Sequence, residues 1–117
     1  MLGQAKPRIL CVSRSEFQLR AICSSIPAQE YEIVSASTPE QAVAVCASNQ
    51  LAAVVLDSEF VTDGWSAART LKMVNPKVPV VLLGWNDDKD TPHGVDAIAA
   101  TYSHLAHKLE ALLKRRP

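Results

Sequence analysis

The chain lacks an excess of charge of either sign. Its 117 residues carry 12 basic and 12 acidic side chains, which cancel at pH 7. A protein that is drawn to nucleic acid or to an anionic membrane by its overall field carries net positive charge. We therefore expect neither as a partner. The basic cluster Lys114-Arg115-Arg116 is typical of a solvated helix end that complements the helix dipole.

The sequence also lacks a long apolar run. A membrane-spanning helix needs roughly 20 consecutive apolar residues, and no stretch of the chain approaches that composition. The segment Met1 to Pro7 has no apolar stretch of the kind found in secretion signals. We therefore predict a cytoplasmic protein.

Paired cysteines and a glycine-rich phosphate loop are missing too. The three cysteines, Cys11, Cys23 and Cys46, are widely separated and form no C-x-x-C motif. Each lies among apolar residues, which favours reduced thiols in the core over a disulfide or a metal site. The absence of a glycine-rich loop argues against a flavin or dinucleotide enzyme.

What the sequence does have is a short apolar run, 51–57 (LAAVVLD), that ends in an acid. A Val-rich run of this length is typical of a strand that is buried on both faces of a parallel sheet. A carboxylate such as Asp57 is out of place in a core. At the carboxyl end of a buried strand it would lie at the rim of the sheet, where open α/β folds bind their ligands.

The rest of the chain alternates between strand and helix patterns. A capping signal at Ser15 and Gln18 opens the first helix, and residues 31–36 alternate as an edge strand does. This order predicts one α/β domain with a five-stranded parallel sheet, strand order 2-1-3-4-5, wrapped by helices on both faces. The predicted strands are 8–12, 31–36, 51–57, 78–83 and 95–100, and the predicted helices are 16–25, 39–48, 65–74 and 103–115.

Two consequences follow from that strand order. The first and third strands flank the switch point of the sheet, so their ends, Ser13-Arg14 and Asp57, should be neighbours. The polar segment 84–94 has room for only about a turn of helix. The fourth helix of the alternation is therefore expected to be shortened or missing.

Four segments of this arrangement form a recognisable set: Ile9-Leu10-Cys11-Val12, Val54-Val55-Leu56-Asp57, Asp63-Gly64 and Pro79-Val80-Val81-Leu82-Leu83. With them the chain resembles the receiver domain of bacterial two-component response regulators. The resemblance covers about residues 8–113, within one domain over 1–117, and implies a flavodoxin-like, doubly wound fold. It places Asp57 at the phosphoacceptor position.

The resemblance also implies groups around Asp57 that this chain has replaced. Receivers hold Mg²⁺ with an acidic pair at the end of the first strand, where Ser13 and Arg14 stand here. Their Ser or Thr after the fourth strand maps onto Gly84, and their Lys after the fifth strand maps near Thr101. Metal, hydroxyl and cation each stabilise the transition state of phosphoryl transfer. We therefore expect no cofactor, weak or absent Mg²⁺ binding and no enzymatic activity.

Three further positions belong to this pocket or border it. Trp85 follows Gly84, and its indole could lie over the pocket and close it. Glu16 is the acid left in the first loop and could be a residual metal ligand, although a solvated first-turn residue is the preferred interpretation. Arg14 could donate a charge-assisted hydrogen bond to Asp57 in place of the metal. We hypothesise that Asp57 is not efficiently phosphorylated.

The leading prediction is a receiver-like signalling module, related to two-component phosphorelays, that acts by phosphorylation-independent contact with a protein partner or as a homodimer. Dimer contacts would come from Tyr102, Leu105 and Leu112 or from the loop around Trp85. One alternative is a working receiver in which a histidine kinase phosphorylates Asp57. A second is sensing of a small anion or nucleotide at the same rim.

Two weaker candidates have simpler interpretations. His104 and His107 lie three residues apart on the last predicted helix, where surface histidines are expected rather than half a metal site. The acidic loop does not match the spacing of a calcium-binding loop and is expected to be solvated. Its residues are Asp87, Asp88, Asp90 and His93.

Overall fold

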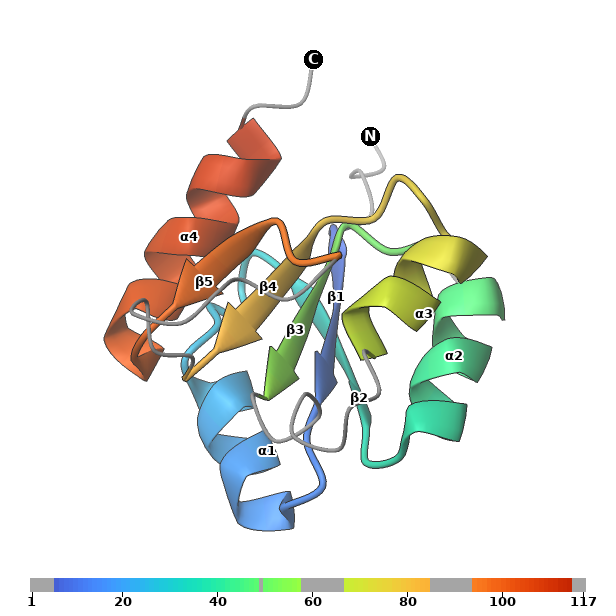
Figure 1. Ribbon diagram of the computed structural model, residues 1–117. Coiled ribbons are helices and arrows are strands. Elements are labelled where there is room, and N and C mark those ends of the chain that lie inside the picture. The colour runs from blue at the N-terminus through green and yellow to red at the C-terminus, as the bar shows by residue number, and fades with distance from the viewer. Residues whose placement is uncertain (1–5, 49, 58–66, 85–93, 115–117) are drawn as a thin grey trace.

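The computed structural model describes residues 6–48, 50–57, 67–84 and 94–114. Its described strands form one parallel sheet in the order β2-β1-β3-β4-β5, as predicted. Figure 1 shows the strands side by side with their carboxyl ends at one edge. The strands are β1 (Arg8–Val12), β2 (Glu32–Ala36), β3 (Ala53–Asp57), β4 (Val80–Leu83) and β5 (Ala97–Ala99).

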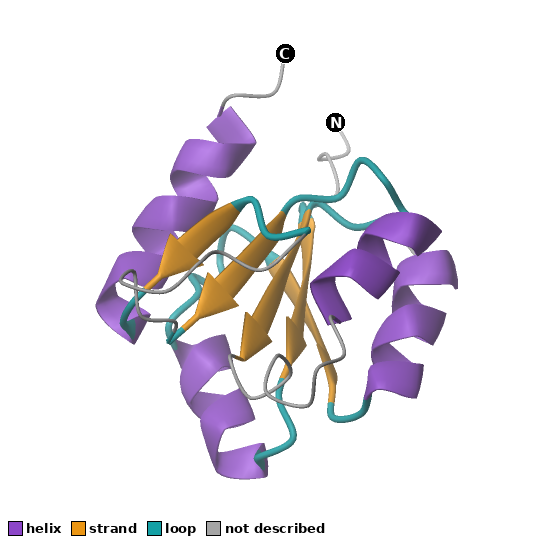
Figure 2. Ribbon diagram, in the orientation of Figure 1, coloured by secondary structure: helices purple, strands orange, loops and turns teal. Residues whose placement is uncertain are grey.

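The helices cover both faces of this sheet, which forms the middle layer in Figure 2. One face packs against α1 (Glu16–Ser24) and α4 (Tyr102–Lys114), and the other against α2 (Pro39–Ser48) and α3 (Ala67–Val74). All residues of β3 and β4 are buried, because helices lie over both faces of the central strands. The strand β2 has a mixed burial pattern because it lies at the edge.

Side-chain caps open the first two helices, and the one at Ser15 was predicted from the sequence. Ser15 Oγ accepts a hydrogen bond from the backbone N–H of Gln18 at 3.2 Å and caps α1. Thr38 Oγ1 accepts one from the N–H of Gln41 at 3.1 Å at the start of α2. Each bond satisfies a donor that the helix itself leaves unpaired.

The return from β4 to β5 is fixed by contacts that the sequence analysis did not anticipate. Asp96 Oδ2 accepts hydrogen bonds from the backbone N–H of Val80 at 2.8 Å and from Lys72 Nζ at 2.7 Å. Gly94 has φ of +90°, and a Cβ there would lie 2.9 Å from the backbone of Ala68 and Arg69 in α3. The predicted shortened helix falls mostly within 85–93, outside the described residues.

Burial corrects one prediction about the cysteines. Cys11 and Cys46 are buried as expected, whereas Cys23 is half-buried. Cys23 lies at the border of the core, because it packs against the cluster that contains Cys11 but keeps part of its surface exposed. None of the helices that the structure describes has the length and apolar character needed to cross a bilayer.

Candidate functional site

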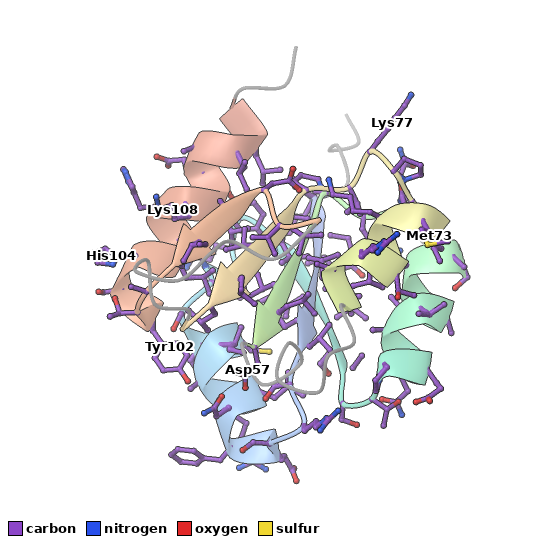
Figure 3. The ribbon with its side chains drawn as sticks, viewed as in Figure 1. Asp57, Met73, Lys77, Tyr102, His104 and Lys108 are labelled. Atoms are coloured by element: carbon purple, nitrogen blue, oxygen red, sulfur yellow. The ribbon has the colours of Figure 1, made fainter. Side chains whose placement is uncertain are left out.

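Asp57 lies at the carboxyl edge of the sheet, as its position in the sequence predicted (Figure 3). It is the last residue of β3 and lies in register with Leu83, the last residue of β4. Only 5% of its surface is exposed. A carboxylate that is this buried needs hydrogen-bond donors or a cation nearby, because its charge is otherwise poorly solvated.

Ser13 supplies such a donor. It follows β1, is fully buried, and its Oγ donates a hydrogen bond to Asp57 Oδ2 at 2.9 Å. Ser13 is itself held in place, because its N–H donates to the carbonyl of Ala36 at 3.2 Å and its Oγ accepts from the N–H of Ser15 at 3.2 Å. A hydrogen bond to an ionised carboxylate is stronger than one between neutral groups. The sequence predicted that Ser13 and Asp57 would be neighbours but not that they would bond.

Arg14 and Glu16 lie on the solvent side of the same loop, since both side chains are exposed. Glu16 Oε1 accepts a hydrogen bond from Arg20 at 3.4 Å along α1, which is the first-turn arrangement preferred from the sequence. The proposed bond from Arg14 to Asp57 stays a prediction.

A cavity beside Asp57 is lined by two of the positions that the resemblance matched to functional residues of receivers. Gly84 and Thr101 both line it, so the structure brings them together with Asp57 as predicted. Trp85 falls outside the described residues. The lining residues are Gln18, Asp57, Leu83, Gly84, Ala100, Thr101 and Tyr102.

The chemistry that Gly84 and Thr101 can offer is limited. Gly84 has no side chain, has φ of 84°, and donates its N–H to the carbonyl of Ala99 at 2.8 Å. The Thr101 hydroxyl is engaged at the start of α4, 2.9 Å from Ser103 Oγ and 3.2 Å from His104 Nδ1. Neither residue brings a positive charge to the cavity.

Tyr102 and Gln18 are members of this site that the sequence analysis missed. Both line the cavity, whereas the sequence indicated Tyr102 only as a dimer contact. The start of α4 follows β5 directly, so the strand order itself placed Tyr102 at the same edge as Asp57.

Within 6–48, 50–57, 67–84 and 94–114, no group of three or more His, Cys, Asp or Glu side chains is arranged to hold a metal ion. His104 and His107 are both exposed, as expected for surface histidines. The acidic loop at 87–93 lies outside the described residues.

Comparison with known proteins identifies the fold. No family model and no curated protein sequence matches the chain. A response regulator from Thermotoga maritima superposes with a TM-score of 0.79 and 13% identity, over 93% of this chain and 98% of that one. The chemotaxis protein CheY4 of Vibrio cholerae gives 0.76 and 16% identity, over 93% and 100%.

A third solved structure also superposes on this chain over nearly its whole length. The receiver domain of a sensor histidine kinase from Pseudomonas aeruginosa PAO1, which has a magnesium ion coordinated in its active-site cleft, gives a TM-score of 0.78 with 21% identity. The match covers 94% of this chain and 99% of that domain. The chain therefore has the fold of response-regulator receiver domains, as the resemblance predicted.

Proposed function

We propose that this chain is a receiver-like signalling module that acts through protein–protein contact without a phosphorylation cycle. The observation that carries the proposal is the 2.9 Å hydrogen bond from Ser13 Oγ to Asp57 Oδ2. In receivers the end of the first strand provides an acidic pair for Mg²⁺. Here the end of the first strand provides the neutral hydroxyl of Ser13, which donates a hydrogen bond directly to the Asp57 carboxylate.

The surrounding residues support the same conclusion. Mg²⁺ prefers several oxygen ligands in octahedral order, whereas the position after Ser13 is the cation Arg14. Ser13 and Arg14 therefore do not fit Mg²⁺ in the way that the acidic pair of receivers does. Gly84 lacks the hydroxyl, and Thr101 lacks the cation, that receivers use at these positions to stabilise a transferring phosphoryl group. Groups that act together in catalysis fail together, so replacing all of them should abolish phosphorylation in practice.

Exposed aromatic side chains near the rim support protein contact. Phe17 on α1 is 82% exposed and Tyr102 at the start of α4 is 39% exposed. Tyr102 and Gln18, the neighbour of Phe17, line the cavity beside Asp57. Aromatic residues are enriched in protein interfaces. Leu105 must be removed from the expected dimer contacts, because it is fully buried against the sheet.

Phosphorylation in vitro tests this proposal. The full chain is incubated with acetyl phosphate and Mg²⁺ and its intact mass is measured, with Asp57→Ala and a working receiver as parallel samples. We expect no adduct on the wild-type chain. In a restored variant, with Ser13→Asp, Arg14→Asp and Thr101→Lys combined, we expect an adduct that requires Asp57. A stoichiometric wild-type adduct that disappears in Asp57→Ala would instead establish the phosphoacceptor alternative.

Sensing of a small anion at the rim has less support. Among the described residues that line the cavity, Asp57 is the charged one, and its carboxylate repels anions. A thermal-shift screen separates this alternative, because a bound ligand raises the melting temperature. We expect no shift with phosphate or nucleotides.

A further inference from the structure

The cavity beside Asp57 has a wall of a single charge. Its volume is about 380 Å³, within the range of about 300 to 1,000 Å³ that is usual for ligand sites. Among the described residues that line it, Asp57 is the charged one. Arg14, which the sequence offered as a donor to Asp57, is exposed and is not one of these lining residues. The described wall therefore favours a cation as the ligand.

The burial of Asp57 makes that preference stronger. The residue is 5% exposed, and Ser13 Oγ fixes its carboxylate through the 2.9 Å hydrogen bond to Oδ2. Charges attract each other more strongly where the surroundings have a low dielectric constant than they do in water. A cation that enters the cavity therefore meets a carboxylate that is held in place and poorly screened.

Tyr102 adds an aromatic ring to the same wall. It begins α4, is 39% exposed and lines the cavity together with Asp57. Figure 3 shows both residues at the carboxyl edge of the sheet. The face of an aromatic ring attracts a cation, so the ring and the carboxylate favour the same ligand. Leu83 and Ala100 also line the cavity, and they offer apolar surface to the methylene groups of a long basic side chain.

These features favour a guanidinium group over an ammonium group. A guanidinium is planar, carries five N–H donors, stacks on aromatic faces and is more weakly hydrated than an ammonium. It therefore loses less solvation when it leaves water to meet a buried carboxylate. Gln18 also lines the cavity, and its amide oxygen can accept a further hydrogen bond.

The same wall favours an arginine within a polypeptide over free arginine. The α-carboxylate of the free amino acid would need a cation, and the described lining residues other than Asp57 are uncharged. An arginine within a chain has no such carboxylate. Phe17, the residue before Gln18, is 82% exposed and provides aromatic surface that a polypeptide can cover.

We propose that the cavity beside Asp57 binds an arginine side chain of a protein partner. The proposal rests on the proposed function, because it identifies the partner chemistry of an Asp57 that carries no phosphoryl group. The guanidinium pairs with the Asp57 carboxylate and stacks on Tyr102, and the methylene groups pack against Leu83 and Ala100. Asp57 thereby acts in recognition.

Titration of capped tripeptides into the isotope-labelled full chain, followed by NMR, tests the site. The probes carry arginine, lysine or citrulline between two glycines, and citrulline has nearly the shape of arginine without its charge. We expect saturable shifts of the Asp57, Gly84 and Tyr102 amides with the arginine peptide at millimolar concentration, weaker binding of lysine and none of citrulline. No binding of the arginine peptide, or equal binding of the citrulline peptide, would overturn the proposal. Tighter binding of free arginine than of the capped peptide would overturn the assignment to a protein side chain.

Variants test which residues bind the guanidinium. Asp57→Asn keeps an acceptor but loses the charge, so it should weaken binding of the arginine peptide about tenfold or more. Tyr102→Leu removes the ring and should weaken binding about fivefold, whereas Tyr102→Phe should bind like the wild type. Met73→Ala is the control, because Met73 is 77% exposed on α3, which packs on the opposite face of the sheet from α4. Unchanged binding by folded Asp57→Asn would overturn the proposal, and the citrulline comparison decides if that variant does not fold.

Failure of this site and failure of the proposed function give different results. A chain that binds the arginine peptide and also forms an Asp57 adduct with acetyl phosphate would contradict the proposed function but support the arginine site. A chain that forms no adduct and binds no arginine peptide would overturn the arginine site alone.

Discussion

The buried carboxylate of Asp57 is stabilised by a residue of its own chain. Ser13 is fully buried and bonds to Asp57 Oδ2, while its Oγ also accepts from the N–H of Ser15. The hydroxyl therefore links the end of β3 to the turn that begins α1. Its role is structural and electrostatic, in a position where receivers bind a metal.

Removing this hydroxyl should lower stability. In Ser13→Ala the buried carboxylate loses a donor and the N–H of Ser15 loses an acceptor, so the free energy of unfolding should fall by about 2 kcal/mol. Denaturant unfolding measures this change. Ser24→Ala, at an exposed position of α1, serves as the control and should change stability by less than about 0.5 kcal/mol. Equal losses in the two variants would show that the Ser13 bond contributes nothing.

The acidity of Cys23 gives stability a predictable dependence on pH. Its pKa falls from 9.0 in the unfolded chain to about 7 in the folded one. Between these values the unfolded chain binds more protons, so the contribution to stability rises as pH rises from 7 to 9 and is lost as pH falls through 7. Under reducing conditions, the stability difference between wild type and Cys23→Ser should grow over this range. A difference that is independent of pH would contradict the assignment.

At the scale of elements, the sequence predicted the type and order of the strands and helices. Apolar runs identified β1, β3 and β4 because strands that are buried on both faces leave little choice of residue. The predicted ends of the strands were less accurate. The strand predicted over 95–100 is formed only from Ala97 to Ala99, where it pairs with β4. Val95 and Ala100 are apolar but lie outside β5, and composition alone does not reveal where the strand ends.

The close approach of α3 to the start of β5 depends on Gly94. An added Cβ would lie 2.9 Å from the α3 backbone, and φ is +90°. Gly94→Ala should therefore lower the free energy of unfolding by roughly 2 kcal/mol or more.

Gly84→Ala is the matched comparison, because Gly84 also has positive φ but is exposed. Thermal and denaturant unfolding should show the larger loss at Gly94. Equal losses would mean that backbone conformation, and not the contact with α3, accounts for the effect.

At the scale of the whole molecule, topology accounts for the site. The order β2-β1-β3-β4-β5 brings Ser13, Asp57, Gly84 and Thr101 to one edge, and that order could be predicted from the alternation of patterns. The bond between Ser13 and Asp57 could not, because it depends on side-chain orientation within a turn. Asp63, Gly64, Trp65 and Trp85 lie outside the described residues, so the predictions made for them stay predictions.

The central claim is that Asp57 is held by its own chain instead of by a divalent cation. Calorimetric titration of Mg²⁺ into the wild type and into the double variant with Ser13→Asp and Arg14→Asp tests it most directly, because the variant restores two carboxylate ligands of the kind that Mg²⁺ prefers. We predict no saturable binding by the wild type at millimolar Mg²⁺ and saturable binding by the variant. Saturable wild-type binding that is abolished in Asp57→Asn would contradict the claim.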